Sequence, residues 1–199
     1  NELLFSALAN LNTDNAQGEY YLTDIIEILK NEGHSVAAYQ TEDFNESLGV
    51  NDRVALAYAN TVMRERINHQ HMLNGVTLVD PATTFIDADV VIGSDTVIEG
   101  NVTIKGKTVI GEDCVITNGS QIVDSQIADA VVIKASVVEN SIIHQQADVG
   151  PYAHLRPHSE IGAKAHIGNY VEIKNATIGE ETKVGHLTYV GDATLGREI

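Results

Sequence analysis

From residue 86 to residue 122 the sequence reads IDADVV IGSDTV IEGNVT IKGKTV IGEDCV ITNGSQ I, so an isoleucine returns at every sixth position. The interval shortens to five at Ile127, Val138 and Ile143, and aliphatic residues then continue at intervals of five or six as far as Leu195. A period of six fits neither an α-helix nor a simple alternating strand, and hexapeptide repetition is a signature of the parallel β-helix. The fold predicted for this part of the chain is therefore mostly β.

Each hexad supplies one short strand and one corner of the predicted β-helix. The aliphatic residue points inward and stacks on its equivalents in neighbouring coils, so the core grows one coil at a time. Three hexads per coil give a stacking interval of about 18 residues, a distance between coils of about 4.8 Å and roughly six coils in all. Cys114 falls in a small inward position, which favours a core residue over a reactive thiol.

The residues before the repeat predict mixed α and β structure. Apolar residues recur at helical spacing and are followed by Gly33, which suits a helix C-cap. These apolar residues are Leu22, Ile25, Ile26 and Leu29. Residues 35–39 read as a short strand, and residues 52–75 read as a long helix that ends at Asn74-Gly75. The predicted organisation is an α/β region over residues 1–51, a linker helix over 52–75 and the β-helix over 76–199.

The charge balance excludes several classes of partner. The chain has 12 Lys and Arg against 28 Asp and Glu, a formal charge of −16, which would repel both a phosphate backbone and an anionic membrane. We therefore expect no nucleic-acid or membrane partner. There is neither an apolar run of about 20 residues nor an export signal, and Cys114 stands alone, so a cytoplasmic location is expected. The chain starts at Asn1 and stops at Ile199 within a repeat, which predicts a piece of a longer protein.

Two cations of the β-helix are separated by one coil. Arg156 and Lys174 each follow an inward aliphatic residue and lie 18 positions apart (174 − 156), so they are predicted to stand one above the other. Cations about 5 Å apart repel by roughly 0.8 kcal/mol in water, which favours a bound anion such as a phosphate. The alternative is a solvated face on which Glu172 or Glu160 relieves the repulsion.

His186 occupies an outward corner position of its hexad. An imidazole has an ordinary pKa of about 6.5 and so suits a general base near neutral pH, although an exposed histidine can equally be a plain surface residue. A five-residue step after Ile173 shortens the stacking interval to 17. This places His186 over Asn169, and it also places Tyr189 over Glu172. Both lower residues are candidates to hold the upper ones by hydrogen bonds.

The remaining candidates have mainly structural interpretations. Asn51 precedes the predicted long helix, where an asparagine suits an N-cap. His69 and His71 are spaced too closely to share one helix face, which makes them a poor metal pair. The outward histidines of the β-helix are assigned to the surface, namely His144, His154, His158 and His166.

Four blocks of sequence, in this order, carry a resemblance to a known family. They are NAQGEYYLTD at 15–24, GVNDR at 49–53, LRP at 155–157 and GHLTY at 185–189. Together with the hexads they resemble the bacterial bifunctional N-acetylglucosamine-1-phosphate uridylyltransferase / glucosamine-1-phosphate N-acetyltransferase, along the whole chain. The resemblance implies a left-handed β-helix preceded by the remnant of a Rossmann-like nucleotidyltransferase domain. It also implies a cytoplasmic homotrimer that makes UDP-N-acetylglucosamine for the cell wall.

The resemblance assigns roles to particular residues. It implies that His186 is the general base, that Arg156, Lys174 and Tyr189 bind the sugar phosphate, and that Asn51 helps to hold Mg²⁺ and the nucleotide sugar. The substrates implied are glucosamine 1-phosphate with acetyl-CoA, and N-acetylglucosamine 1-phosphate with UTP. The family's glycine-rich nucleotide loop and its last coils have no counterpart in this sequence.

Neither active site is therefore expected to be complete, and this chain alone is expected to form no UDP-sugar from UTP. The alternatives are a catalytically silent trimerisation scaffold, or another hexapeptide-repeat acyltransferase or sugar nucleotidyltransferase.

Overall fold

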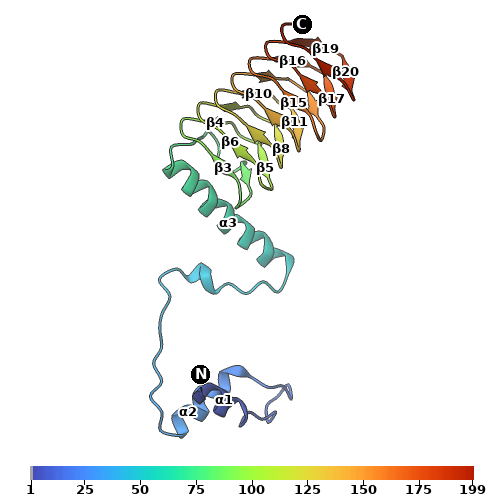
Figure 1. Cartoon of the computed structure of the whole chain (residues 1–199). Coiled ribbons are helices and arrows are strands. Elements are labelled where there is room, and N and C mark those ends of the chain that lie inside the picture. The colour runs from blue at the N-terminus through green and yellow to red at the C-terminus, as the bar shows by residue number, and fades with distance from the viewer. Residues whose placement is uncertain (1) are drawn as a thin grey trace. The chain divides into compact units, whose positions relative to one another are not determined.

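The computed structural model describes residues 2–199 (Figure 1). The chain divides into two compact units, and the boundary between them in the sequence lies between Leu48 and Gly49. The first unit is helical. Its elements are α1 (Glu2–Leu8), the 3₁₀ helix η1 (Leu22–Asp24), α2 (Ile25–Asn31) and the 3₁₀ helix η2 (Phe44–Ser47). Helix α2 ends as the sequence predicts, because Gly33 has a φ of 83° and the amide of His34 donates to the carbonyl of Leu29.

The strand predicted over residues 35–39 is wrong. These residues are exposed and irregular, and no strand forms within residues 2–48. A strand needs a neighbour to take up its backbone hydrogen bonds, and side-chain preference alone cannot supply one. The first unit therefore contains no sheet in the described part of the chain.

Helix α3 (Arg53–Leu73) opens the second unit and contacts β1 (Thr77–Leu78) and β2 (Phe85–Ile86). The side-chain amide of the buried Asn68 donates to the carbonyls of Pro81 and Thr84, at 2.9 and 3.0 Å, and so fastens the helix to the first coil. Among the helices of residues 2–199, none combines the length and apolar content needed to cross a bilayer.

The N-cap of α3 is Asp52, so the interpretation of Asn51 as the cap is wrong. The Asp52 carboxylate accepts a hydrogen bond from the amide of Ala55 at 2.7 Å. A capping oxygen must reach the amide two or three residues further on, and Asp52 has that position. Asn51 lies one residue too early.

Replacing Asp52 with alanine should lower the free energy of unfolding of the second unit by about 1 kcal/mol, because an N-terminal amide of α3 loses its acceptor. The matched control is Asn51→Ala, which should leave the denaturation midpoint unchanged. Urea denaturation followed by circular dichroism measures both. Equal midpoints for the two variants would contradict the assignment of the cap.

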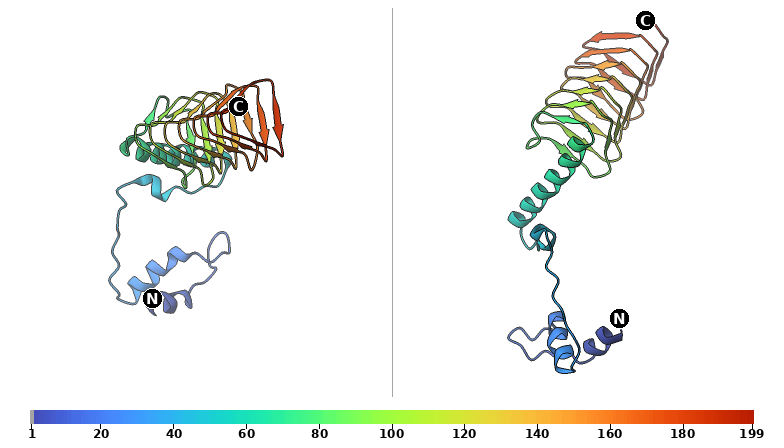
Figure 2. Two further views of the ribbon diagram at one scale, coloured as in Figure 1. Left: turned by 45° about the horizontal axis from the view of Figure 1, so that its top comes forward. Right: turned by 90° about the vertical axis from the view of Figure 1, so that its left-hand side faces the viewer.

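The β-helix is built from strands of two to four residues. The strands after β1 and β2 are β3 (Val91–Ile92), β4 (Val97–Ile98), β5 (Thr103–Lys105), β6 (Val109–Ile110), β7 (Val115–Ile116), β8 (Gln121–Val123), β9 (Gln126–Ile127), β10 (Val132–Ile133), β11 (Val137–Glu139), β12 (Ile142–Ile143), β13 (Asp148–Val149), β14 (His154–Leu155), β15 (Glu160–Ile161), β16 (His166–Asn169), β17 (Glu172–Lys174), β18 (Thr177–Ile178), β19 (Lys183–His186), β20 (Tyr189–Gly191) and β21 (Thr194–Leu195). Every third strand joins the same sheet, so sheets A, B and C start at β1, β2 and β3 and contain seven parallel strands each. Figure 2 shows the coils stacked along one axis.

The structure has seven coils, against the roughly six predicted. The additional coil arises because β1 pairs with β4, with Leu78 beside Ile98, before the first isoleucine of the repeat. Inward aliphatic residues stack as predicted, and the largest fully buried side chains are Ile98, Ile104, Ile110, Ile116, Ile122, Ile133, Ile143, Leu155, Ile161, Ile167, Ile173 and Ile178. Cys114 is confirmed as a core residue, and burial raises the pKa of its thiol.

One corner of the β-helix, between sheets B and C, contains a column of buried hydroxyl groups. This hydroxyl column consists of Thr108, Ser125, Ser141 and Ser159, one on each of four successive coils. Each side chain is at most 3% exposed and donates to a backbone carbonyl on its own coil. The hydroxyl column therefore supplies hydrogen-bond donors to the backbone carbonyls of the corner. Its serine and threonine side chains are small enough for the tight turn.

Candidate functional site

The candidate site lies along sheet B and the adjoining end of sheet A. In sheet B, β14, β17 and β20 are neighbours, with Leu155 beside Ile173 and Glu172 beside Tyr189. In sheet A, Asn169 of β16 lies beside His186 of β19. The structure therefore has the register expected from the sequence, in which His186 stands over Asn169 and Tyr189 stands over Glu172.

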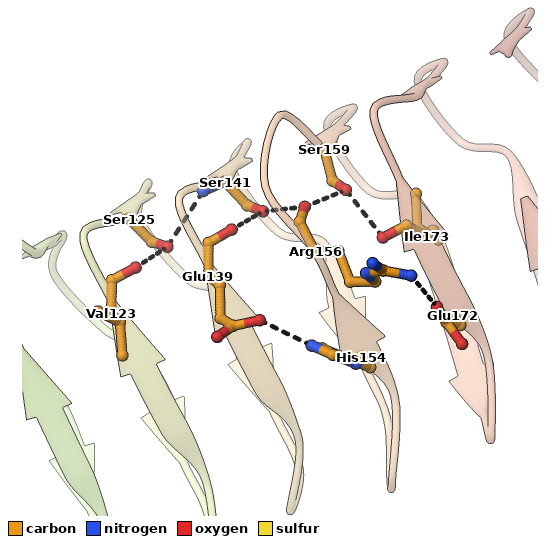
Figure 3. Close-up of polar contacts among 9 residues, drawn as sticks. All are labelled: Val123, Ser125, Glu139, Ser141, His154, Arg156, Ser159, Glu172 and Ile173. Atoms are coloured by element: carbon orange, nitrogen blue, oxygen red, sulfur yellow. Dashed lines mark hydrogen bonds and ion pairs between the residues drawn. The ribbon is translucent and has the colours of Figure 1, made fainter. Parts of the chain in front are cut away.

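Arg156 points toward a carboxylate. One guanidinium nitrogen, Nη1, donates to Oε1 of Glu172 at 2.8 Å, and both side chains are partly exposed (Figure 3). The hydrogen bond to Glu172 raises the pKa of Arg156, and charge attraction from the same carboxylate adds to this. Glu172 thus relieves the repulsion between Arg156 and Lys174, which was the alternative to a bound anion.

Lys174 follows Ile173 on the next coil and is half-buried. Within residues 2–199 its ammonium group has no ion-pair partner. Its neighbour in sheet B is Gly191, and a Cβ at that position would overlap the hydroxyl of Tyr189. The Tyr189 side chain therefore lies along its own strand and reaches Gly191, on the coil next to that of Lys174.

Neither of the hydrogen bonds considered for His186 and Tyr189 forms among the described residues. In the part of the chain that the structure describes, the side chain of His186 has no partner on Asn169, and Tyr189 does not bond Glu172. The backbone register is right, but Glu172 bonds Arg156 instead, and His186 is exposed. The imidazole is consequently open to a bound molecule.

Three of the other outward histidines form pairs with carboxylates on neighbouring coils. His144 pairs with Glu160 at 2.9 Å and His154 with Glu139 at 2.8 Å. His166 pairs with Asp148 at 2.6 Å. Their surface location is as expected, but the pairing was missed, and a spacing of 15 to 18 residues between a histidine and a carboxylate is the signal that could have found it.

The residues considered as metal ligands are not gathered into a metal site within residues 2–199. Asn51 is exposed and directly precedes Asp52, the cap of α3. No group of three or more His, Cys, Asp or Glu side chains within residues 2–199 is arranged to hold a metal ion. His71 is partly buried in α3, which lowers its pKa, and it has no ligand set around it in the same range. Asn51 alone does not fit a Mg²⁺ centre, so no chemical step is assigned to a metal here.

Three parallel sheets of hexapeptide repeats, with cations and an open histidine on the last coils, define a hexapeptide-repeat β-helix protein of the left-handed class. The chain is 69% identical over all of its 199 residues to the bifunctional protein GlmU of Enterococcus faecalis (strain ATCC 700802 / V583), of which it covers 43%. It is 61% identical to the bifunctional protein GlmU of Lactobacillus delbrueckii subsp. bulgaricus, again over the whole chain and 43% of the relative. Over its whole length the chain is therefore similar to one part of the GlmU proteins.

The chain spans less than half the length of the curated relatives it matches. Residues 137–199 also match the family described as the GMPPB C-terminal domain. Among solved structures, the acetyltransferase domain of PglB from Neisseria gonorrhoeae FA1090 is similar, with a TM-score of 0.49 and 12% identity, over 65% of this chain and 63% of that chain.

Proposed function

We propose that the β-helix binds glucosamine 1-phosphate and transfers an acetyl group to its amine from acetyl-CoA. The observation that supports this most directly is the pair of cations on adjacent coils, of which Lys174 has no ion-pair partner within residues 2–199. A phosphate monoester carries the charge that such a pair needs. Arg156 can bind two of its oxygens as a fork, and Lys174 adds a point charge.

Glu172 forms an ion pair with Arg156 when no phosphate is bound. An ion pair that is largely open to water contributes little, so a dianionic phosphate can displace the carboxylate at low cost. Tyr189 lies above Glu172 and beside Gly191, the sheet neighbour of Lys174, and its hydroxyl is proposed to contact the sugar phosphate. Asn169 and Glu172 are proposed as supporting residues, because they are the sheet neighbours of His186 and Tyr189 and so set the backbone positions of both.

His186 is the proposed general base. The amine of the sugar attacks the thioester carbonyl carbon, a C–N bond forms and the C–S bond breaks. His186 takes the proton that the amine loses, and coenzyme A leaves as the thiolate and is protonated to the thiol. An exposed imidazole without a protein partner in the described residues is suited to accept that proton.

The proposal extends to the whole protein. Residues 1–51 are proposed as the end of a Rossmann-like uridylyltransferase domain, residues 52–75 as the linker helix and residues 76–199 as part of the acetyltransferase domain. The uridylyl transfer would use UTP, N-acetylglucosamine 1-phosphate and Mg²⁺, with Asn51 as one contact among others, in the cytoplasm.

A trimer is proposed to form through the β-helix. Outward valines stack on sheet A, with Val97 beside Val115 and Val115 beside Val132, and Val91 on sheet C is 58% exposed. Such apolar columns are typical of surfaces that another subunit covers. Sedimentation at micromolar concentration should give a trimer mass. A monomer alone would contradict the proposal.

Lys174→Ala tests the phosphate site in a full-length protein that contains this chain. The Michaelis constant for glucosamine 1-phosphate should rise by about 10- to 100-fold, because a hydrogen bond to a charged group contributes about 1.5 to 3 kcal/mol. The assay follows release of the coenzyme A thiol, which the parent should show with this sugar phosphate. No release by the parent would favour the silent scaffold.

Lys105→Ala is the matched control for Lys174. Lys105 also follows an inward isoleucine in sheet B and is exposed, but it lies on a distant coil beside Val123. Its removal should leave the Michaelis constant unchanged. Similar increases in both variants would show that general charge, and not a local phosphate contact, is responsible.

A further inference from the structure

The hydroxyl of Ser159 lies between two backbone carbonyls on adjacent coils, that of Arg156 and that of the residue before Lys174. Its Oγ is 2.6 Å from the carbonyl oxygen of Arg156 and 3.1 Å from that of Ile173, which directly precedes Lys174 (Figure 3). The side chain is 1% exposed. One buried hydroxyl thus contacts both the carbonyl of Arg156 and the carbonyl of Ile173, the residue before Lys174.

Ser159 is the member of the hydroxyl column whose link joins the coils of Arg156 and Lys174, while Ser141 joins the coils of Glu139 and Arg156 in the same way. On the next two coils the equivalent corner positions are Ala176 and Ala193, so the column ends at Ser159. The hydroxyl of Ser141 also reaches the Arg156 carbonyl, at 3.2 Å. Two side-chain hydroxyls therefore converge on the backbone of Arg156, and one of them continues to the next coil.

We propose that Ser159 is a positioning residue that fixes the spacing of Arg156 and Lys174 for the sugar phosphate. The inference rests on the proposed function and adds a residue to it. A bidentate arginine and a neighbouring lysine bind a phosphate well only if both start from the correct backbone positions. A hydroxyl shared between the two strands holds these positions without touching the substrate.

Ser159→Ala tests this in a full-length protein that contains the chain. The Michaelis constant for glucosamine 1-phosphate should rise by about three- to tenfold, the effect of losing one neutral hydrogen bond. The Michaelis constant for acetyl-CoA and the turnover number should stay the same, because the change affects the phosphate site. Ser159→Thr should behave like the parent, since Thr108 occupies the same column position.

The fold should tolerate Ser159→Ala. The Arg156 carbonyl keeps the Ser141 hydroxyl, and the Ile173 carbonyl keeps the amide of Arg156 at 2.8 Å. Neither group is left buried without a partner, so the melting temperature should stay close to that of the parent. If the alanine variant nevertheless unfolds, Ser159→Cys keeps the volume but donates weakly, and it should raise the same constant.

Ser125→Ala is the matched control. Ser125 is fully buried in the same column and donates to the Val123 carbonyl at 2.8 Å, far from the cations. It should leave all kinetic constants unchanged. An equal rise in this control, or no rise in Ser159→Ala while Arg156→Ala raises the constant strongly, overturns the positioning role. If Arg156→Ala has no effect either, the phosphate site itself is contradicted.

Discussion

Replacing His186 with alanine, in a full-length protein that contains this chain, is expected to lower acetyl transfer at least about a hundredfold. A positioned general base typically contributes about 10² to 10⁴ in rate, which corresponds to roughly 3 to 5 kcal/mol of barrier. His186 is exposed and outside the isoleucine core, so the free energy of unfolding should change by less than about 0.5 kcal/mol. Uridylyl transfer should be unaffected. Steady-state assays of both reactions and a melting curve measure these effects.

His158→Asn is the control for His186→Ala. His158 is also exposed, and it occupies a left-handed corner where the neighbouring coils place Asn140 and Asn175. Asparagine is therefore compatible with the backbone there, and acetyl transfer should be unchanged. If His186→Ala retains activity within about threefold of the parent, below the range expected for a base, then the base lies elsewhere.

The second large effect is expected at Gly168, in the chain of 199 residues. A Cβ at Gly168 would overlap the carbonyl oxygen of Gly185 on the next coil. Because both groups belong to closely stacked backbones, Gly168→Ala must push β16 and β19 apart. Overpacking of this kind costs about 1 to 3 kcal/mol, and more where the backbone must move.

Gly185→Ala is the matched control for this change. A Cβ at Gly185 meets no atom within 4 Å, so its stability should equal that of the parent. Urea denaturation of the two variants compares the same substitution on neighbouring coils of one sheet. A Gly168→Ala protein as stable as the Gly185→Ala protein would contradict the close stacking of β16 on β19.

The backbone of the β-helix follows from the sequence because its period is short and continuous. An isoleucine at every sixth position determines which residues face inward, and a five-residue step determines where the stacking interval falls to 17. The pairing of Asn169 with His186 could therefore be predicted to the residue. The predicted number of coils was one too low, because β1 contains no isoleucine and lies before the repeat.

Side-chain contacts at the site were less predictable. Arg156 and Glu172 have several rotatable bonds, so a known backbone register still leaves several possible partners within reach. Tyr189 illustrates this, because its register is as predicted while its hydroxyl lies beside Gly191. In the first unit, Val36 and Tyr39 favour a strand, but residues 35–39 have no pairing partner among the described residues and form none.

Each coil of the β-helix is hydrogen-bonded only to the coils directly before and after it. Cooperativity in such a stack passes between nearest neighbours, so local opening costs least at the ends and most in the middle. His186 belongs to β19, whose pairing with β16 places it beside Asn169. A change in the backbone of β16 would therefore reach the proposed base directly. A change several coils away would reach it only through every coil between.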